Sequence, residues 1–238
     1  MIKYAQQVSI AIFLFLSLSG FSCITKGSYG PTERESRNIG TFNEIEVSHG
    51  INVYITLGSR HSLEVETSKD LMKKLVTEVR GDRLRIYFEG NFMWMNTASV
   101  FVQAEEISKI SASGGADVVG EDEIRGRDLE LSASGGSDIR LEIDVENLEV
   151  EVSGAADIEL AGATNYLEAS SSGGSDLKAY QLVAQRARLE ASGGSELKVY
   201  VEQDIDARAS GGADIKYRGN PKNVQAQDSS GGDVTKVN

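Results

Sequence analysis

Carboxylates recur along the second half of the chain at a spacing of about 20 residues, each beside a pair of small residues. This acidic column comprises Asp117, Asp138, Asp157, Asp176, Glu196, Asp214 and Asp233. If the copies stack in register, neighbouring carboxylates lie about 4.8 Å apart. Such charges repel by about 0.9 kcal/mol even in a water-like dielectric, so something must offset the repulsion. We expect hydrogen bonds from turn N–H groups or serine hydroxyls, with bound cations as the alternative.

Two kinds of chemistry could use such a column. The string Gly-Gly-x-Asp partly resembles the calcium-binding nonapeptide repeat, although it lacks a glycine and has a longer period. Retaining glycosidases need two carboxyl groups about 5 to 5.5 Å apart, a spacing that any stacked acidic column satisfies. Catalysis also needs a groove and a carboxyl with a raised pKa. A carbohydrate-active enzyme is therefore an alternative to a binding or structural protein.

Other reactive side chains are scarce. The histidines are His49 and His61, and Cys23 is the single cysteine. A metal-ligand cluster or a nucleophilic triad has almost no material here, so we predict no catalytic residue, no metal and no cofactor.

Two short segments are candidates for recognition. Phe92, Met93, Trp94 and Met95 bring the single tryptophan together with other large apolar residues between two asparagines. They suit a loop that contacts a glycan or a protein, or a hydrophobic plug over the end of a core. Arg80-Gly81-Asp82 spells the integrin-binding tripeptide, but Gly-Asp between two strand-like runs is an ordinary hairpin turn.

The acidic residues belong to a sequence repeat. Each copy has the form S-G-G-x-D, with apolar residues at every second position before and after it, as at Leu129, Leu131, Ile139 and Leu141. Coils of about 20 residues predict an all-β fold, a right-handed parallel β-helix of about seven coils over residues 111–238. An antiparallel meander or sandwich is the alternative.

The glycine columns of the repeat are not uniform. Ala155 replaces the second glycine of one copy, and Ser230 replaces the first glycine of another. We therefore expect that no corner position strictly requires a positive φ.

Residues 38–110 predict an irregular head that continues into the solenoid. Ser48-His49-Gly50-Ile51-Asn52 repeats the corner pattern and predicts a divergent first coil. A strand around Leu63 and Val65, a short helix at 69–75 and a hairpin at 76–88 should follow. Such a unit could cap the open end of the solenoid.

The N-terminus predicts export. Residues 1–22 contain Lys3, an apolar run from Val8 to Leu18 that is too short to span a bilayer, and small residues before Cys23. We expect signal peptidase II to leave Cys23 as a lipidated N-terminus, with 23–37 as the tether of an outer-membrane lipoprotein on the periplasmic face or the cell surface. A soluble secreted chain with a free cysteine is the alternative.

The chain is acidic, and loss of Lys3 with the signal changes its formal net charge from −12 to −13. This acidity disfavours nucleic acid and other phosphate-rich partners, whereas cations, basic proteins and neutral sugars remain compatible.

Gly50-Ile51-Asn52, followed by repeated S-G-G-x-D turns, resembles the bacterial family described as "putative auto-transporter adhesin, head GIN domain", over roughly Phe42 to Asn238. The resemblance implies an exported β-helical domain, common in Bacteroidetes-type bacteria, and no catalytic residue. We therefore expect a non-enzymatic adhesin-like or scaffold module with a glycan or protein ligand and a membrane contact through its lipid anchor alone. A carbohydrate-active enzyme and a self-associating structural protein are the alternatives, and the oligomeric state stays open.

Overall fold

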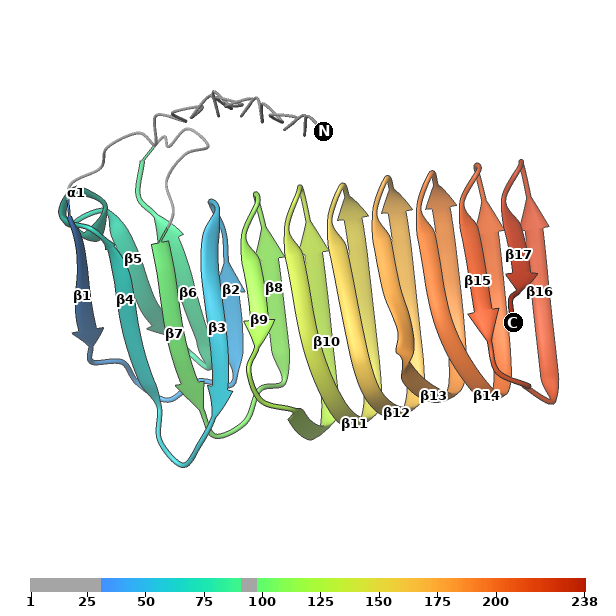
Figure 1. The fold of residues 1–238 in the computed structure, drawn as a ribbon, viewed down its shortest axis with the longest axis horizontal. Coiled ribbons are helices and arrows are strands. Elements are labelled where there is room, and N and C mark those ends of the chain that lie inside the picture. Colours follow the sequence, from blue (N-terminus) through green and yellow to red (C-terminus); the bar gives the residue numbers. More distant parts are fainter. Residues whose placement is uncertain (1–30, 91–97) are drawn as a thin grey trace, which may run out of the picture.

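The computed structural model of the protein describes residues 31–90 and 98–238. Over these residues the chain forms an elongated β-solenoid of about seven turns, with strands stacked side by side along its length (Figure 1). The prediction of a β-solenoid is therefore confirmed. Within the described residues, no helix is both long and apolar enough to cross a membrane.

The repeat region consists of ten strands. They are β8 (Lys109–Ser113), β9 (Asp117–Gly120), β10 (Ile124–Ser134), β11 (Asp138–Gly154), β12 (Asp157–Gly173), β13 (Asp176–Gly193), β14 (Glu196–Ser210), β15 (Asp214–Arg218), β16 (Asn223–Ser229) and β17 (Asp233–Lys236). All of them pair in parallel with strands of a neighbouring coil.

Each coil contributes to two layers. We call the segments that follow a glycine corner the post-corner layer, and those that precede one the pre-corner layer. The long strands β11 to β14 bend halfway and so belong to both (Figure 1). In β11, buried and exposed residues alternate, and Ile139, Leu141, Leu148 and Val150 point into the core. The predicted period of two is confirmed, because one face of every pleated strand packs against the opposite layer.

The corners correct the expectation about φ. The first residue after the leading serine has a positive φ in every corner, including the non-glycines His49 (φ 68°) and Ser230 (φ 53°). The second residue has a positive φ in only some corners, at Gly50, Gly115, Gly212 and Gly231. Ala155 occupies the second position of a corner in which that residue has an ordinary φ, which explains why a side chain is accepted there.

The variable residue of S-G-G-x-D is buried inside the corner, and in the six copies from Ala116 to Ala213 it is alanine or serine. Where it is serine, its hydroxyl reaches the preceding coil. The Ser175 Oγ donates to the carbonyls of Val152 (3.1 Å) and Ser172 (2.9 Å). The position is almost completely buried in these six copies, where a close-packed interior favours a small side chain.

The head coil does not occupy the predicted first position. It consists of β2 (Glu44–Val47) and β3 (Ile51–Leu57), which pair on one side with β8 and β9. On the other side they pair with β6 (Arg83–Phe88) and β7 (Ala98–Ala104). A later segment of the chain thus forms the outer coil, and the coil of Gly50-Ile51-Asn52 lies between that segment and the repeats.

The outer end of the head is closed by antiparallel strands. β4 (Ser62–Ser68) pairs with β7, and β5 (Leu75–Arg80) forms a hairpin with β6 that turns at Gly81-Asp82. The helix α1 (Lys69–Met72) joins β4 to β5. The strand and hairpin predicted for this segment are confirmed, and the helix predicted at 69–75 is present but shorter, because it ends at Met72 and Leu75 already belongs to β5.

The tether predicted for 23–37 is wrong for its last part, because Thr32–Arg37 forms strand β1 against β4. Nearly all side chains of β1 are exposed. Its sequence, TERESR, accordingly shows no alternation of apolar and polar residues. It is held by charged contacts instead, with Arg34 at 3.0 Å from Glu66 and Arg37 donating to the carbonyl of Leu75 (2.7 Å).

The C-terminal coil ends in exposed strands. Every residue of β16 is exposed, and Val224 is the large hydrophobic residue that stands out at 46% exposure among the described residues. Register places Asp228 on the inward column of Ala209, and Lys236 on that of Tyr217. Inward charges on an edge strand discourage another strand from pairing there.

Candidate functional site

The acidic column exists and runs along the outer surface of the post-corner layer. Its seven members are partners in register, each with the next, from Asp117 to Asp233. Asn52 extends the column into the head, because it lies directly beside Asp117. The stacking inferred from the repeat is therefore confirmed.

A basic column beside it offsets the repulsion. Two residues after four of the seven carboxylates stand Arg140, Lys178, Lys198 and Lys216. The Lys178 Nζ lies 2.6 Å from Asp157, and the Lys216 Nζ lies 2.6 Å from Glu196. Both lysines therefore bridge to a carboxylate of the preceding coil, and Lys216 also lies 3.3 Å from Asp214 of its own coil.

We expected serine hydroxyls to donate hydrogen bonds to the carboxylates. This expectation is wrong for the serines that lie inside the corners. Ser137, Ser175 and Ser195 point inward and donate to backbone carbonyls, whereas the carboxylates point outward. Within 31–90 and 98–238, no group of three or more His, Cys, Asp or Glu side chains is arranged to hold a metal ion.

Two members of the acidic column, Glu196 and Asp117, differ in charge environment. Burial tends to raise the pKa of Glu196, but hydrogen bonds from Lys198 and Lys216 outweigh it and hold that pKa below its usual value. The pKa of Asp117 is raised, first by burial and then by the neighbouring Asp138. Asp117 has Asn52 on its other side, which supplies no positive charge.

An aromatic pair lies on the same layer, in the head. Tyr54 of β3 and Phe101 of β7 are partners in register, and their rings stack with centroids 5.2 Å apart and planes at 16°. The guanidinium of Arg34 lies over the Phe101 ring, 4.8 Å from its centroid. Arg34 is in turn held by Glu64 (3.4 Å) and Glu66 (3.0 Å).

These rings line a groove of about 360 Å³, which we call the aromatic groove. Its wall also contains side chains that can donate or accept hydrogen bonds, namely Ser36, Asn38, Ser62, Glu64, Gln103 and Glu121. His61 borders it with a structural role, since its Nε2 lies 2.8 Å from the Phe42 carbonyl oxygen and its ring meets that of Phe42 edge-on. An aromatic wall with a few fixed polar groups is typical of a small-ligand site.

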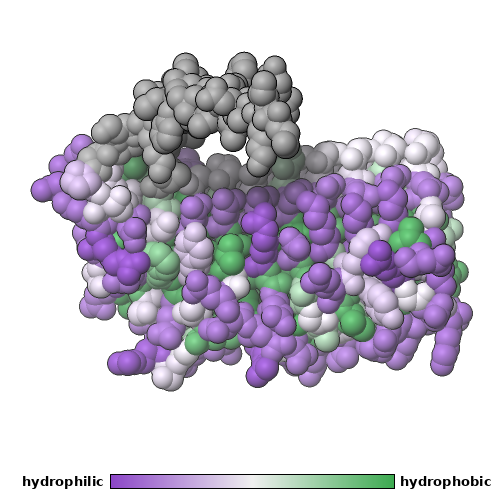
Figure 2. All heavy atoms as spheres, in the orientation of Figure 1, coloured by the Kyte–Doolittle hydropathy of each residue, from purple (hydrophilic) through white to green (hydrophobic). Residues whose placement is uncertain are grey.

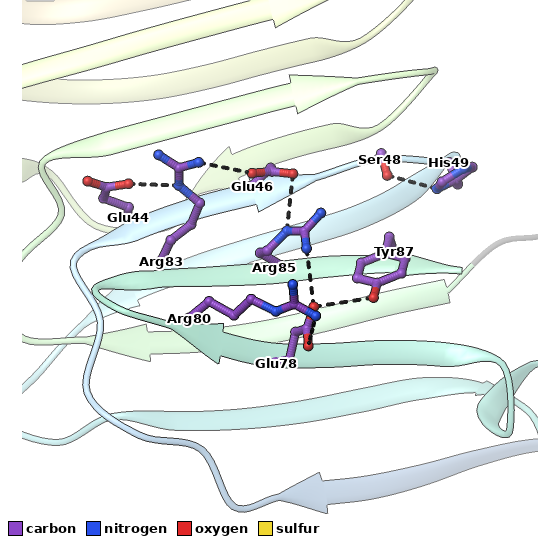
Figure 3. Close-up of polar contacts among 9 residues, drawn as sticks. All are labelled: Glu44, Glu46, Ser48, His49, Glu78, Arg80, Arg83, Arg85 and Tyr87. Carbon is purple, nitrogen blue, oxygen red and sulfur yellow. Dashed lines mark hydrogen bonds and ion pairs between the residues drawn. The ribbon is translucent and has the colours of Figure 1, made fainter. Parts of the chain in front are cut away.

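A second groove, on the pre-corner layer of the head, is lined by charged residues and has a volume of about 510 Å³. Figure 3 shows carboxylates and guanidiniums alternating across three strands. The Arg83 Nε lies 2.8 Å from Glu44, and Arg85 lies 3.4 Å from Glu46 and 3.2 Å from Glu78. Because each arginine already has a carboxylate partner, this groove presents little net charge to a ligand.

The hairpin interpretation of Arg80-Gly81-Asp82 is confirmed. Arg80 pairs with Glu78 at 3.0 Å, and Gly81 has φ +62°. The backbone carbonyl of Asp82 accepts hydrogen bonds from the N–H groups of Asn43 and Glu44, which anchors the turn to the head coil.

Sequence reasoning missed Tyr54, Phe101 and Arg34. A signal was present, because Tyr54 and Phe101 are large aromatics at outward positions of alternating strands. The candidates Cys23, Phe92, Met93, Trp94 and Met95 lie outside the described residues. The triplet Gly50-Ile51-Asn52 forms the corner of the head coil, with Ile51 fully buried.

Comparison with solved structures shows the same fold. A crystal structure described as a "putative adhesin" from Bacteroides fragilis has a TM-score of 0.81 at 18% identity, covering 87% of this chain and 97% of that one. A "putative lipid binding protein" from Parabacteroides distasonis has a TM-score of 0.71 at 21% identity, covering 88% and 98%. A "putative adhesin" from Parabacteroides merdae has a TM-score of 0.70 at 18% identity, covering 88% and 97%.

Comparison with curated proteins finds no match. A family model, however, matches residues 41–221, which is most of the chain. The match includes the head coil, the aromatic groove residues Tyr54 and Phe101, and six of the seven repeat corners. The chain therefore belongs to the family described as "Putative auto-transporter adhesin, head GIN domain".

Proposed function

We propose that this protein is an exported, lipid-anchored recognition module of the cell envelope that binds a neutral glycan in the aromatic groove and has no enzymatic activity. The observation that carries the proposal is the stacked pair of Tyr54 and Phe101 at a groove lined by amide, hydroxyl and carboxylate groups. Membership of an adhesin-like family supports an exported or surface protein.

The groove suits a sugar for physical reasons. Aromatic rings offer apolar area to the C–H groups of a sugar, and the surrounding polar groups can bind its hydroxyls. Both rings stand on paired strands of a rigid sheet, which reduces the entropy lost on binding. The formal net charge of −12 favours a neutral ligand over a phosphorylated or otherwise anionic one.

Lipidation of Cys23 would set the orientation of the molecule. Eight residues separate Cys23 from β1, and an extended chain covers at most about 3.5 Å per residue. The head would then stay within about 30 Å of the membrane, while the C-terminal coils project away from it.

Glycan binding can be tested with the chain lacking 1–22 and carrying Cys23→Ser, which keeps it soluble. The protein is screened on an array of neutral and acidic glycans, followed by titration of the hits. We expect saturable binding of a neutral glycan that weakens at least about tenfold, or 1.4 kcal/mol, in Phe101→Ala and in Tyr54→Ala.

The matched control is Gln225→Ala, which removes an exposed side chain from the last coil, far from the groove. Trp94→Ala tests the alternative that residues 92–95 carry the site. Absence of binding to every neutral glycan, or binding that both groove variants leave intact, would overturn the proposal.

The lipid anchor has a separate test. Cells that express the full chain are labelled with radioactive palmitate and fractionated. Label on the wild type and its loss in Cys23→Ser, with release of the protein from the membrane fraction, are the expected results. An unlabelled, soluble wild-type protein would show that the secreted alternative holds.

A further inference from the structure

A second aromatic patch lies on the post-corner layer, in the C-terminal half of the solenoid. Tyr180 of β13, Tyr200 of β14 and Arg218 of β15 form this distal patch. The guanidinium of Arg218 lies over the Tyr180 ring, 4.1 Å from its centroid. Tyr200 is the partner of Arg218 in register, so the three side chains lie together.

An irregularity in β13 shapes the distal patch. Pairing with β14 passes from Ala179 and Val199 directly to Val183 and Tyr200, which leaves the residues between Ala179 and Val183 without partners in β14. Tyr180 is the first of them, and it is only partly buried. Such bulges redirect side chains away from the regular pleat and are common beside binding sites.

The distal patch and the aromatic groove share one face. Measured along the solenoid axis, Tyr54 and Tyr180 are four strand spacings apart, through β9, β11 and β12, which is about 19 Å. Along the same axis, Tyr54 and Tyr200 are five strand spacings apart, which is about 24 Å. Figure 2 shows this side of the molecule covered mainly by hydrophilic side chains, with hydrophobic groups among them.

The surface between the two sites is a row of polar groups at a fixed spacing. The acidic and basic columns run along this surface from one site towards the other. Ion pairs such as that of Lys178 with Asp157 partly neutralise the charges of the two columns. Carboxylates outnumber cations along these columns, so a polyanion would be repelled. A chain of uncharged hydroxyl-bearing units would find donors and acceptors at each coil.

We propose that the distal patch is a second contact site for the ligand of the aromatic groove, and that this ligand is a linear neutral oligosaccharide lying along the solenoid axis. The inference rests on the proposed function, and it specifies that the ligand is an extended chain and not a single terminal sugar. Two weak sites joined by one ligand give a higher affinity than either site alone.

The length of the oligosaccharide is the variable that tests this proposal. The soluble Cys23→Ser protein is titrated calorimetrically with cello-, chito- and manno-oligosaccharides, from the disaccharide to the octasaccharide. In the series that binds, we expect the octasaccharide to bind at least about tenfold more tightly than the disaccharide. Tyr200→Ala and Tyr180→Ala should abolish this gain and leave the disaccharide affinity within about twofold of wild type, whereas Gln225→Ala should change neither.

The outcomes separate the two proposals. Disaccharide binding that Phe101→Ala removes, without any gain on lengthening, would support the groove and overturn the distal patch. A gain in affinity with oligosaccharide length that persists in both Tyr180→Ala and Tyr200→Ala would also overturn the proposal for the distal patch. If none of these oligosaccharides binds, the proposal for the distal patch fails, and the proposal for the aromatic groove is decided by the glycan array. The melting temperature of each variant is measured as well. If it stays within a few degrees of wild type, loss of the length-dependent gain in affinity reflects binding and not unfolding.

Discussion

Gly173 sits directly on Gly154 of the preceding coil, so closely that a methyl group on Gly173 would lie 2.9 Å from the Gly154 carbonyl oxygen. The same contact recurs between Gly193 and Gly173, where the shortest distance would be 3.0 Å. Gly173 also has a φ of +82°, a region that L-residues adopt at a cost. Space and backbone conformation therefore both favour glycine at position 173.

Gly173→Ala should destabilise the solenoid by about 2 kcal/mol or more, since about 1 to 2 kcal/mol of left-handed strain adds to the clash with the neighbouring coil. The matched control is Gly174→Ala. Its φ is ordinary and its nearest new contact would be 3.7 Å, so we expect a change below about 1 kcal/mol. Thermal and urea unfolding monitored by circular dichroism measures both. Equal losses would contradict the distinction between the two positions.

Asp117→Asn should raise the melting temperature at neutral pH. The raised pKa of Asp117, due to burial and to Asp138, means that folding opposes its ionisation. Such a carboxylate costs stability above its folded pKa, and the cost disappears as the pH falls below its unfolded value near 3.8. We therefore expect a gain below about 1 kcal/mol at pH 7 that vanishes near pH 3. A loss of stability at pH 7 would sink this interpretation.

Glu196→Gln should have the opposite effect. The folded pKa of Glu196 lies below its unfolded value of 4.5, because Lys198 and Lys216 outweigh the effect of burial. Its contribution to stability is present above the unfolded pKa and is lost as the pH falls through the folded one. We expect a loss of roughly 0.5 to 1 kcal/mol at pH 7 that shrinks in acid and in high salt.

The control for that experiment is Glu149→Gln. In register, Glu149 lies between Glu130 and Glu168, so neutralising it removes repulsion and no loss of stability is expected. Equal destabilisation by the two variants would show that the lysine contacts of Glu196 contribute nothing particular.

Replacing the inward charges of the last coil should promote self-association. Asp228 and Lys236 stand where the preceding coil has the buried Ala209 and Tyr217. The double variant Asp228→Val, Lys236→Val would offer an apolar edge beside the exposed Val224. We expect a concentration-dependent rise in mass by sedimentation velocity. Gln227→Val, which alters an outward position of the same strand, should leave the mass unchanged, and a wild type that already assembles would contradict the protective role of these charges.

Much of the fold follows from local pattern. Every coil packs one face of its strands into the core and turns sharply at the same position. For this reason the sequence predicted the repeat, the alternation of apolar residues and the acidic column. The hairpin at Gly81-Asp82 was predictable for a similar reason, since a turn depends on a few adjacent residues. Even so, the requirement for positive φ at Ser230 was hidden, because a serine can be forced into that conformation by its neighbours.

The candidate site depends on which coil stacks on which, and no local pattern states that order. Tyr54 and Phe101 meet because β7 returns to pair with the outer side of β3, so the head coil ends up between β7 and the repeats. β1 escaped prediction because an exposed edge strand carries no apolar alternation. The types and spacing of the residues thus determined the structure of each coil and the charged columns on its surface. Which side chains form a groove was decided by the stacking of segments distant in the sequence, and that stacking is driven by burial of a shared core.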